Sequence, residues 1–326
     1  MRAWQVTALG EPADVLELAD LEPPRPAAGQ IRIRVRAVGV NFADVLLARG
    51  QYQTRPPLPF IPGVELCGDV VEVGDGVTGH APGQRVVASV LGALAEEVVV
   101  AAHAVRAAPE QLDDAAAAVL TVSYQTAWFA LHHRARVQPG ETVVVHAAAG
   151  GVGIATVQLA KAAGARVIAV VGAAPEKAAA AEAAGADELV DRTTQDVTTA
   201  IRELTGGRGA DVAIDPVGGD AYDASARAIA LDGRIVLIGF AGGRIQEIRA
   251  APVLVRNYGV LGLYWALYLD QRPDLCDLAH TEIRRLIAQG AARPLVADTV
   301  PFDQAPSALT RLAGGETVGR LAVGVR

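Results

Sequence analysis

The sequence predicts an α/β fold in which a doubly wound parallel sheet is inserted into a second domain that is rich in β-structure. Between Val143 and about Gly262, short apolar runs without alternation recur between helix-like segments, a pattern typical of parallel strands buried on both faces. The first hundred residues instead alternate in polarity and are interrupted by glycine and proline. Near the C-terminus the chain reads as strand, helix and strand, which most simply pack back on the N-terminal β-structure. We therefore expect two domains with a cleft between them.

Composition and charge argue against a nucleic-acid or membrane protein. The 326 residues carry a net charge of −7, which disfavours nucleic acid as the main partner. The N-terminus lacks an apolar core of signal-peptide length, and no uncharged apolar run reaches about 18 residues, so we expect no membrane span and a cytoplasmic location. Cys67 and Cys276 are the only cysteines. We expect both to be reduced, and two thiols cannot form a four-cysteine zinc site.

The first domain is expected to contain several short strands. The stretch QIRIRVRAV places arginines on one face and an apolar row on the other, formed by Ile31, Ile33, Val35 and Ala37. Further strands are expected at residues 67–74 and 84–90. The proline-rich segments 22–29 and 54–63 are short enough to be ordered loops.

The second domain is expected to alternate strands and helices after a helix-rich segment at residues 113–135. Strands are expected at residues 142–146, 166–171, 188–191, 211–215 and 233–239. Helices are expected between them, with Pro175 suited to a first turn, Gly185 to a helix end, and Thr193 and Asp196 to a helix start.

A glycine-rich turn between the first strand and helix of this domain predicts dinucleotide binding. Residues 148–153 read A-x-G-x-x-G, so Ala148 replaces only the glycine of the tight turn and fits if its φ stays negative. Gly150 would let the backbone approach a pyrophosphate, and Gly153 would let the helix pack closely on its strand. The flanking strand and helix supply the context that the motif requires. The alternative is that these glycines serve packing alone.

The end of the next strand favours NADPH over NADH. An NAD site usually carries Asp or Glu there to hold the ribose 2′-hydroxyl, but this chain reads Gly172-Ala173-Ala174-Pro175. Lys177 and Arg192 could both reach a 2′-phosphate, and Lys177 is one of only two lysines. The alternative is that both are ordinary solvated side chains.

Four segments together resemble the zinc-free quinone oxidoreductases, relatives of zeta-crystallin in the medium-chain dehydrogenase/reductase superfamily. They are HAAAGGVG, Asn41-Phe42-Ala43-Asp44, Pro62-Gly63-Val64-Glu65 and GRIVLIGFAGG. The resemblance implies a GroES-like catalytic domain at 1–122 and 263–326 and a Rossmann NADPH-binding domain at 123–262. It also implies a homodimer formed through the edge of the Rossmann sheet, with residues 260–262 as the edge strand.

Departures from zinc-dependent relatives imply that zinc is not used. In those relatives a cysteine ligand stands where this chain has Asn41 and a histidine where it has Val64. Neither replacement is a useful zinc ligand, and Glu65 alone is not a site. A further departure is Arg192, where many family members carry tyrosine.

Without zinc, a conjugated acceptor is the favoured substrate. Hydride transfer to an isolated carbonyl gives an alkoxide about as basic as hydroxide, near pKa ~15.7. Transfer to a quinone gives a phenolate near pKa ~10, a difference worth about 8 kcal/mol of anion stabilisation. This reasoning favours an NADPH-dependent quinone reductase. The alternatives are reduction of an α,β-unsaturated carbonyl or enoyl thioester, and a non-catalytic NADPH-binding protein.

The resemblance also implies site residues. The catalytic candidates are Asn41 as an amide donor, Tyr52 as a donor to the developing oxyanion, and Asp44. The alternatives are that Tyr52 is an aromatic wall of the cleft and that Asp44 caps a helix. Thr126 is placed beside the nicotinamide, although a helical threonine often bonds its own backbone. Tyr264 and Trp265 could stack on a flat substrate or be core aromatics, and His146 is expected to pack. The full set of coenzyme-binding candidates is Thr126, Ala149, Gly150, Gly151, Val152, Gly153, Gly172, Ala173, Lys177, Arg192, Gly239, Phe240, Ala241, Leu263 and Tyr264.

Overall fold

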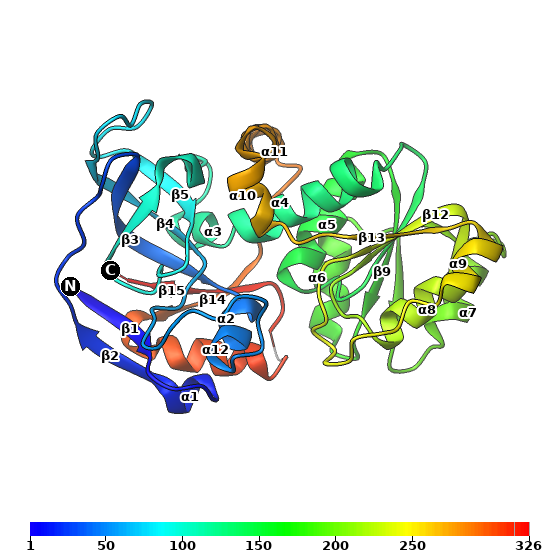
Figure 1. The fold of residues 1–326 in the computed structure, drawn as a ribbon. Helices are drawn as coiled ribbons and strands as arrows, with labels where there is room; N and C mark the ends of the chain where they lie inside the picture. The colour runs from blue at the N-terminus through cyan, green and yellow to red at the C-terminus, as the bar shows by residue number, and fades with distance from the viewer. Residues whose placement is uncertain (316, 326) are drawn as a thin grey trace. The chain divides into compact units, whose positions relative to one another are not determined.

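The computed structural model of the chain describes residues 1–315 and 317–325, which form two compact units (Figure 1). The first unit comprises Met1–Val122, Tyr268–His280 and Pro294–Arg326, and the second comprises Ser123–Leu267 and Thr281–Arg293. Residues 263–267 and 281–293, expected in the first domain, therefore group with the second unit. Residues 316 and 326, also expected in the first domain, lie outside the described residues.

The first unit is built on a mixed sheet of seven strands. Its order is β14-β15-β3-β4-β5-β7, and β6 also pairs with β3. The strands are β3 (Gln30–Val40), β4 (Glu65–Val73), β5 (Arg85–Ser89), β6 (Glu97–Ala101), β7 (Val105–Ala107), β14 (Val296–Pro301) and β15 (Arg320–Gly324). A separate hairpin joins β1 (Arg2–Val6) to β2 (Leu16–Asp20).

Alternation along β3 sets the core of the first unit. Ile31, Ile33, Val35 and Ala37 are all at most 2% exposed, as the sequence predicts, while the arginines between them are half-buried. The C-terminal strand β15 pairs antiparallel with β3, with Leu321 opposite Val40, so the tail does pack back on the N-terminal β-structure. The helices outside the second unit's sheet are α1 (Pro12–Val15), α2 (Phe42–Ala48), α3 (Asp114–Ala118), α10 (Ala266–Gln271), α11 (Pro273–Ala288) and α12 (Ala305–Ala313), with short 3₁₀ turns at Ala102–Ala104 and Phe302–Gln304.

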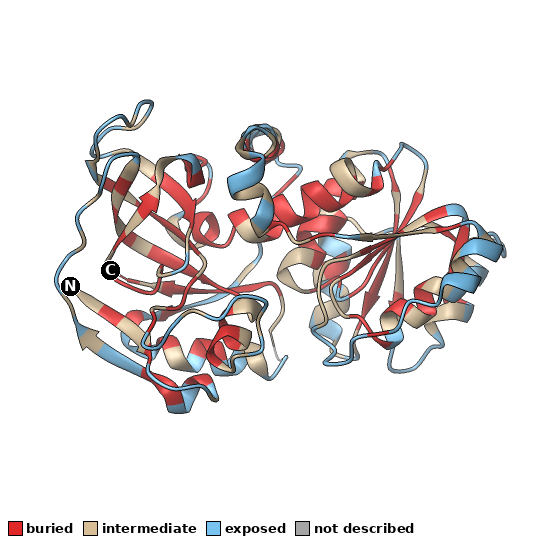
Figure 2. Ribbon diagram, viewed as in Figure 1, coloured by how far each residue is buried: buried red, intermediate tan, exposed pale blue. Residues whose placement is uncertain are grey.

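The second unit is a parallel six-stranded Rossmann sheet. Its order is β10-β9-β8-β11-β12-β13, so the order reverses between β8 and β11, where such sheets bind nucleotides. The strands are β8 (Thr142–Val145), β9 (Arg166–Val171), β10 (Glu188–Asp191), β11 (Ala210–Asp215), β12 (Ile229–Leu237) and β13 (Gly259–Gly262). β8 is buried throughout and β9 is buried from its second residue onward, which explains their unbroken apolar runs (Figure 2). β13 lies at the edge, where the resemblance places it.

Helices pack against this sheet and begin and end at local signals. They are α4 (Thr121–Trp128), α5 (Gly151–Ala162), α6 (Pro175–Ala183), α7 (Val197–Leu204), α8 (Asp220–Ala228) and α9 (Ala250–Arg256). Asp196 caps α7 by accepting the Thr199 N–H at 2.8 Å. Gly185 follows α6 with φ of 103°, which favours glycine. The segment η2 (Phe129–Ala135) continues α4 as a π-helix and packs on β12.

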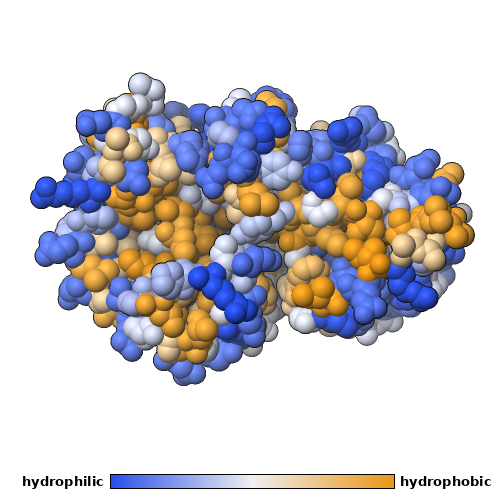
Figure 3. Space-filling model, in the orientation of Figure 1, coloured by the Kyte–Doolittle hydropathy of each residue, from blue (hydrophilic) through white to orange (hydrophobic). Residues whose placement is uncertain are grey.

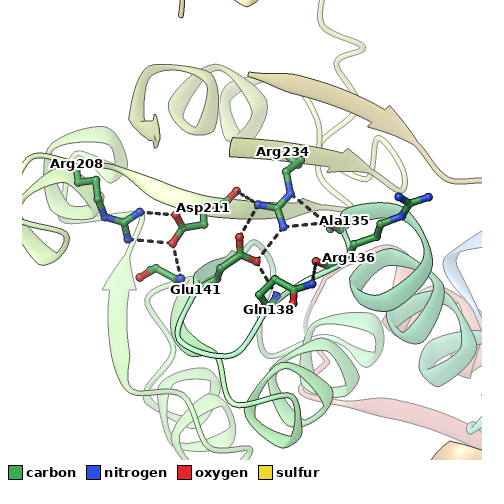
Figure 4. Close-up of polar contacts among 8 residues, drawn as sticks. Ala135, Arg136, Gln138, Glu141, Arg208, Asp211 and Arg234 are labelled. Carbon is green, nitrogen blue, oxygen red and sulfur yellow. Dashed lines mark hydrogen bonds and ion pairs between the residues drawn. The ribbon is translucent and has the colours of Figure 1, made fainter. Parts of the chain in front are cut away.

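An arginine-centred network anchors the end of η2 to the amino end of the sheet (Figure 4). Arg234 on β12 binds both carboxylate oxygens of Glu141 at 2.7 and 2.9 Å, and its Nε donates to the Ala135 carbonyl at 3.0 Å. Asp211 pairs with Arg208 and accepts the Thr142 N–H at 2.7 Å. The network therefore fixes where η2 stops relative to β8, β11 and β12.

The structure bears on two expectations drawn from composition. None of the helices in the part of the chain that the structure describes is long and apolar enough to cross a membrane. Cys67 and Cys276 are both buried and free, as expected.

Candidate functional site

The turn after β8 has the shape that a close approach to the backbone requires. Gly150 is the N-cap of α5, with φ of −84° and ψ of 174°. A Cβ added to Gly153 would lie 2.2 Å from the Ala147 carbonyl oxygen and 2.6 Å from the Ala148 Cα. No side chain fits there, so Gly153 is required for the helix to pack on the turn, as the motif predicts.

The tight part of the turn lies one residue earlier than the motif suggests. Ala147 has φ of 50°, in the left-handed region, whereas Ala148 is not among the residues with positive φ. Ala148 is buried and donates its N–H to the Val170 carbonyl on β9 at 3.1 Å. The exposed Ala147 therefore carries the strain that a glycine would relieve.

Two cationic side chains converge at the end of β9. A Cβ placed on Gly172 would lie 3.9 Å from Arg192 Nη2 and 3.9 Å from Lys177 Nζ, and its three nearest atoms all belong to these two side chains. The Asp191 carboxylate beside Arg192 accepts hydrogen bonds from the N–H and Oγ1 of Thr193, at 2.9 and 2.6 Å, which lower its pKa. The structure thus brings Gly172, Lys177 and Arg192 together.

The loops after β11 and β12 are joined to each other by backbone hydrogen bonds. Asp215 Oδ1 accepts the N–H groups of Val217 and Gly218, each at 2.8 Å. Two hydrogen bonds then join the two loops. The Ala241 N–H donates to the Pro216 carbonyl at 3.1 Å, and the Gly242 N–H donates to the Val217 carbonyl at 2.9 Å. These contacts hold Gly239, Phe240 and Ala241 at the carboxyl end of the sheet.

The remaining coenzyme candidates lie at that same edge or in α4. The carboxyl ends of parallel strands meet at one edge of a sheet. Leu263 follows β13 and donates its N–H to the Leu237 carbonyl at 2.9 Å, and Tyr264 comes next. Ala149 is buried at the turn after β8, Ala173 is exposed after β9, and Thr126 is buried in α4.

His146, directly before the turn, belongs to the core. It is 2% exposed, and its Nε2 lies 2.7 Å from the Oγ of Ser225. Burial lowers its pKa, against the opposing effect of the Asp215 charge. A neutral, packed imidazole agrees with its expected role.

In the first unit, Asn41 belongs to a buried polar cluster. Its Nδ2 donates to the Gly39 carbonyl at 3.1 Å and to Glu65 Oε1 at 3.0 Å. Arg320 Nη2 also donates to Glu65 Oε1, at 2.5 Å, and Glu65 Oε2 accepts the Val122 N–H at 2.9 Å. Both amide protons of Asn41 are therefore engaged within the first unit. Donation to a substrate stays a prediction that requires one of these bonds to open.

Asp44 ties the start of α2 to a neighbouring loop. Its carboxylate accepts the Asn41 N–H at 2.8 Å and the Gly63 N–H at 3.0 Å, and it is 2% exposed. Desolvation raises its pKa to about 7, despite these two hydrogen bonds. These contacts match the alternative interpretation of Asp44, in which its carboxylate caps the start of α2.

Tyr52 is half-buried, and its ring packs against the hydrophobic core of the first unit. This packing is compatible with either expected role, and the action of its hydroxyl stays a prediction.

Among residues 1–315 and 317–325, no group of three or more His, Cys, Asp or Glu side chains is arranged to hold a metal ion. The Glu65 carboxylate, which would be the surviving acidic group near the zinc position of relatives, is instead ion-paired to Arg320.

Sequence reasoning did not identify the partnerships of Glu65 with Arg320 or of Gln125 with Trp265. These pairs are separated by 255 and 140 residues, and no local pattern signals them.

Comparisons with known proteins match both units. Residues 27–110 match the alcohol dehydrogenase GroES-like domain, and residues 151–280 match the family described as zinc-binding dehydrogenase. Quinone oxidoreductase-like protein 2 of Mus musculus is 38% identical over 100% of this chain and 92% of its own length.

Solved structures agree with these sequence matches. Escherichia coli quinone oxidoreductase complexed with NADPH is 29% identical, with a TM-score of 0.93 over 99% of this chain and 100% of the other. A mycobacterial protein complexed with NADPH is 32% identical, also with a TM-score of 0.93 over 99% of this chain and 100% of the other. Because similarity at this level spans the whole chain, the protein belongs to the medium-chain dehydrogenase/reductase superfamily of oxidoreductases, among its quinone oxidoreductase-like members.

Proposed function

We propose that the protein is an NADPH-dependent reductase that transfers hydride to a quinone without a zinc ion. The observation that carries the coenzyme assignment is the convergence of Lys177 and Arg192 on Gly172, where an NAD site would place a carboxylate. Two cations at this point suit a 2′-phosphate. The NADPH in the Escherichia coli and mycobacterial structures supports the same assignment.

The residues at the turn after β8 fit a pyrophosphate. The N–H groups of Gly151, Val152 and Gly153 open α5 and have no carbonyl one turn earlier within the helix. Together with the helix dipole they favour an anion. We assign Ala149, Gly150, Gly151 and Val152 to the pyrophosphate, and Gly239, Phe240, Ala241, Leu263, Tyr264 and Thr126 to the nicotinamide end.

The chemistry of the available donors supports the proposal that zinc is not used. Asn41 and Val64 stand where relatives carry cysteine and histidine ligands, and neither an amide nor an isopropyl group replaces a thiolate or imidazole. When bound, NADPH supplies the hydride. A quinone then carries the new charge as a phenolate, which needs less stabilisation than an alkoxide.

In the first unit, residues of the buried cluster position the backbone, and Tyr52 is the catalytic candidate outside that cluster. Asp44 fixes the N–H groups of Asn41 and Gly63, and Glu65 is neutralised by Arg320. Since the Asn41 amide is anchored, we assign the hydrogen bond to the developing oxyanion first to the Tyr52 hydroxyl.

We further propose a homodimer formed through β13. This edge strand follows α9 and pairs with β12, and the chain from β12 to β13 carries four apolar side chains that are 70–77% exposed, namely Leu231, Ile245, Leu254 and Val255. Helix α9 has no buried residue. Figure 3 shows apolar side chains gathered over this end of the second unit. A second copy would cover both the open strand and the apolar surface.

The test is acceptor-dependent oxidation of NADPH and of NADH, measured with a panel of quinones, enones and enoyl thioesters. We expect NADPH oxidation that depends on a quinone and exceeds NADH oxidation. Tight NADPH binding with no turnover across the panel would instead favour a binding protein, and faster turnover of enones would reassign the acceptor.

The two lysines supply a matched pair of variants. Lys177→Ala is expected to raise the KM for NADPH about ten- to hundredfold, because a charge-assisted bond to phosphate is lost, and to leave NADH unaffected. Lys161 forms an ion pair with Asp187 at 2.7 Å, away from the proposed phosphate site. Lys161→Ala should therefore change neither the KM for NADPH nor the KM for NADH. Equal effects of the two variants would contradict the proposed phosphate site.

A further inference from the structure

A buried glutamine in the second unit has a hydrogen-bond donor without a protein acceptor. Gln125 lies in α4 and is 1% exposed. Its Oε1 accepts the indole N–H of Trp265 at 3.2 Å. Its Nε2 is buried, and no atom in the described part of the chain accepts a hydrogen bond from it.

The identity of the two amide atoms follows from the chemistry of the partner. Oxygen and nitrogen of a glutamine amide can be exchanged in a structure without changing its shape. Tryptophan only donates, so the atom facing the Trp265 indole must be the oxygen. The nitrogen therefore points away from Trp265, and rotating the amide would leave two donors facing each other.

Gln125 lies at the edge of the sheet where the coenzyme candidates gather. α4 continues into η2, whose last residue, Ala135, is held at the amino end of the sheet by Arg234. Gln125 is ten residues earlier, in α4, and therefore lies further along this continuous helical segment from the amino end of the sheet. Its partner Trp265 comes three residues after the end of β13 and two after Leu263. Both observations place Gln125 at the carboxyl ends of the strands.

A second glutamine in the same unit, the half-buried Gln158, has a partner for both its amide oxygen and its amide nitrogen. Gln158 Oε1 accepts the Tyr124 hydroxyl at 2.6 Å and the Arg293 N–H at 2.9 Å. Its Nε2 donates to the Arg293 carbonyl at 3.1 Å. Buried polar groups are nearly always paired. Five other buried side-chain atoms in the described residues also lack a partner, so the Gln125 donor points to a ligand only together with its position at the carboxyl edge of the sheet.

We propose that Gln125 Nε2 donates a hydrogen bond to a carbonyl oxygen of a ligand bound at this edge. The inference rests on the proposed function, which provides two such oxygens: the carboxamide of the nicotinamide and the carbonyl of the acceptor. The Trp265 indole holds the amide plane, and because Nε2 is buried, neighbouring side chains must shift for a ligand oxygen to reach it. Gln125 is thus a binding residue that orients its partner for hydride transfer.

The experiment compares wild-type protein with Gln125→Met, which keeps the side-chain length but removes the donor, and with Gln158→Met as the matched control. NADPH affinity is measured by titration without an acceptor, and kcat/KM is then measured for a quinone. We expect Gln125→Met to lose about tenfold, or about 1.4 kcal/mol, either in NADPH affinity or in kcat/KM for the quinone. Gln158→Met should change neither quantity. A loss in NADPH affinity identifies the carboxamide, and a loss confined to the kcat/KM of the quinone identifies the acceptor.

A second variant keeps the test informative if Gln125→Met does not fold. Gln125→Met/Trp265→Phe removes the indole donor as well, so neither partner is left unpaired, and Trp265→Phe is its reference. The double variant should again lose about tenfold relative to that reference.

The outcomes separate this inference from the proposed function. Wild-type protein that binds no NADPH would overturn the proposed function and the Gln125 inference with it. Wild-type protein that binds and turns over, with variants unchanged within twofold in both quantities, would overturn the Gln125 inference alone.

Discussion

The strained turn before α5 makes a stability prediction whose size follows from one backbone angle. Ala147 has φ of 50° and is exposed, so removing its Cβ relieves strain without opening a cavity. The left-handed region costs a non-glycine residue about 1–2 kcal/mol. Glycine also adds freedom to the unfolded chain, which costs about 0.4–1 kcal/mol. Ala147→Gly should therefore stabilise the protein by about 0.5–1 kcal/mol.

Urea unfolding followed by tryptophan fluorescence measures this change, because Trp128 and Trp265 both lie in the second unit. Ala173→Gly is the matched control: Ala173 is also an exposed loop alanine, but its φ is not positive. The free energy of unfolding of Ala173→Gly should be about 0.4–1 kcal/mol lower than that of wild type, because the substitution only adds conformational freedom to the unfolded chain. If Ala147→Gly is no more stable than wild type, the strain assigned to the turn is absent and the reasoning fails.

Three further predictions concern buried positions. Gly153→Ala should abolish coenzyme binding and destabilise the fold, because its Cβ would lie 2.2 Å from the Ala147 carbonyl oxygen. Coenzyme titration and thermal unfolding measure these two effects, and normal coenzyme binding would refute the prediction. Arg320→Met should cost about 3–5 kcal/mol in chemical unfolding, since it leaves the fully buried Glu65 carboxylate without its cation, and a cost under about 1 kcal/mol would contradict that role. The pKa of Asp44 is raised from 3.8 to about 7, so the folded state holds its proton more tightly than the unfolded state. The stability difference between wild type and Asp44→Asn should therefore shift against wild type by about 3 kcal/mol as pH rises from about 4 to 7. A difference that is flat with pH in unfolding experiments would show that Asp44 ionises normally.

Local patterns were sufficient to predict most of the fold. Alternation from Ile31 to Ala37 identified the half-buried strand β3, because one face of it meets the core. The unbroken apolar run of β8 identified a strand buried on both faces. Asp196 identified the start of α7, because its side chain satisfies a backbone N–H that the helix leaves open.

Features that depend on contacts between residues far apart in the sequence were harder to predict. The motif identified the turn but not the residue that bears the positive φ, because Ala148 is held in place by a hydrogen bond to Val170 on the next strand. Asn41 was expected to face a substrate, yet its amide protons are engaged by Gly39 and Glu65. A single sequence does not show that Glu65 and Arg320 meet.

The position of β15 has a consequence for synthesis on the ribosome. This strand lies between β14 and β3, so the sheet of the first unit stays incomplete until residues Arg320–Gly324 have emerged. All six strands of the second unit, by contrast, lie between Thr142 and Gly262 and emerge together. We therefore expect the nascent chain to assemble its Rossmann sheet first, while β3 of the first unit still lacks its β15 partner and remains accessible to chaperones.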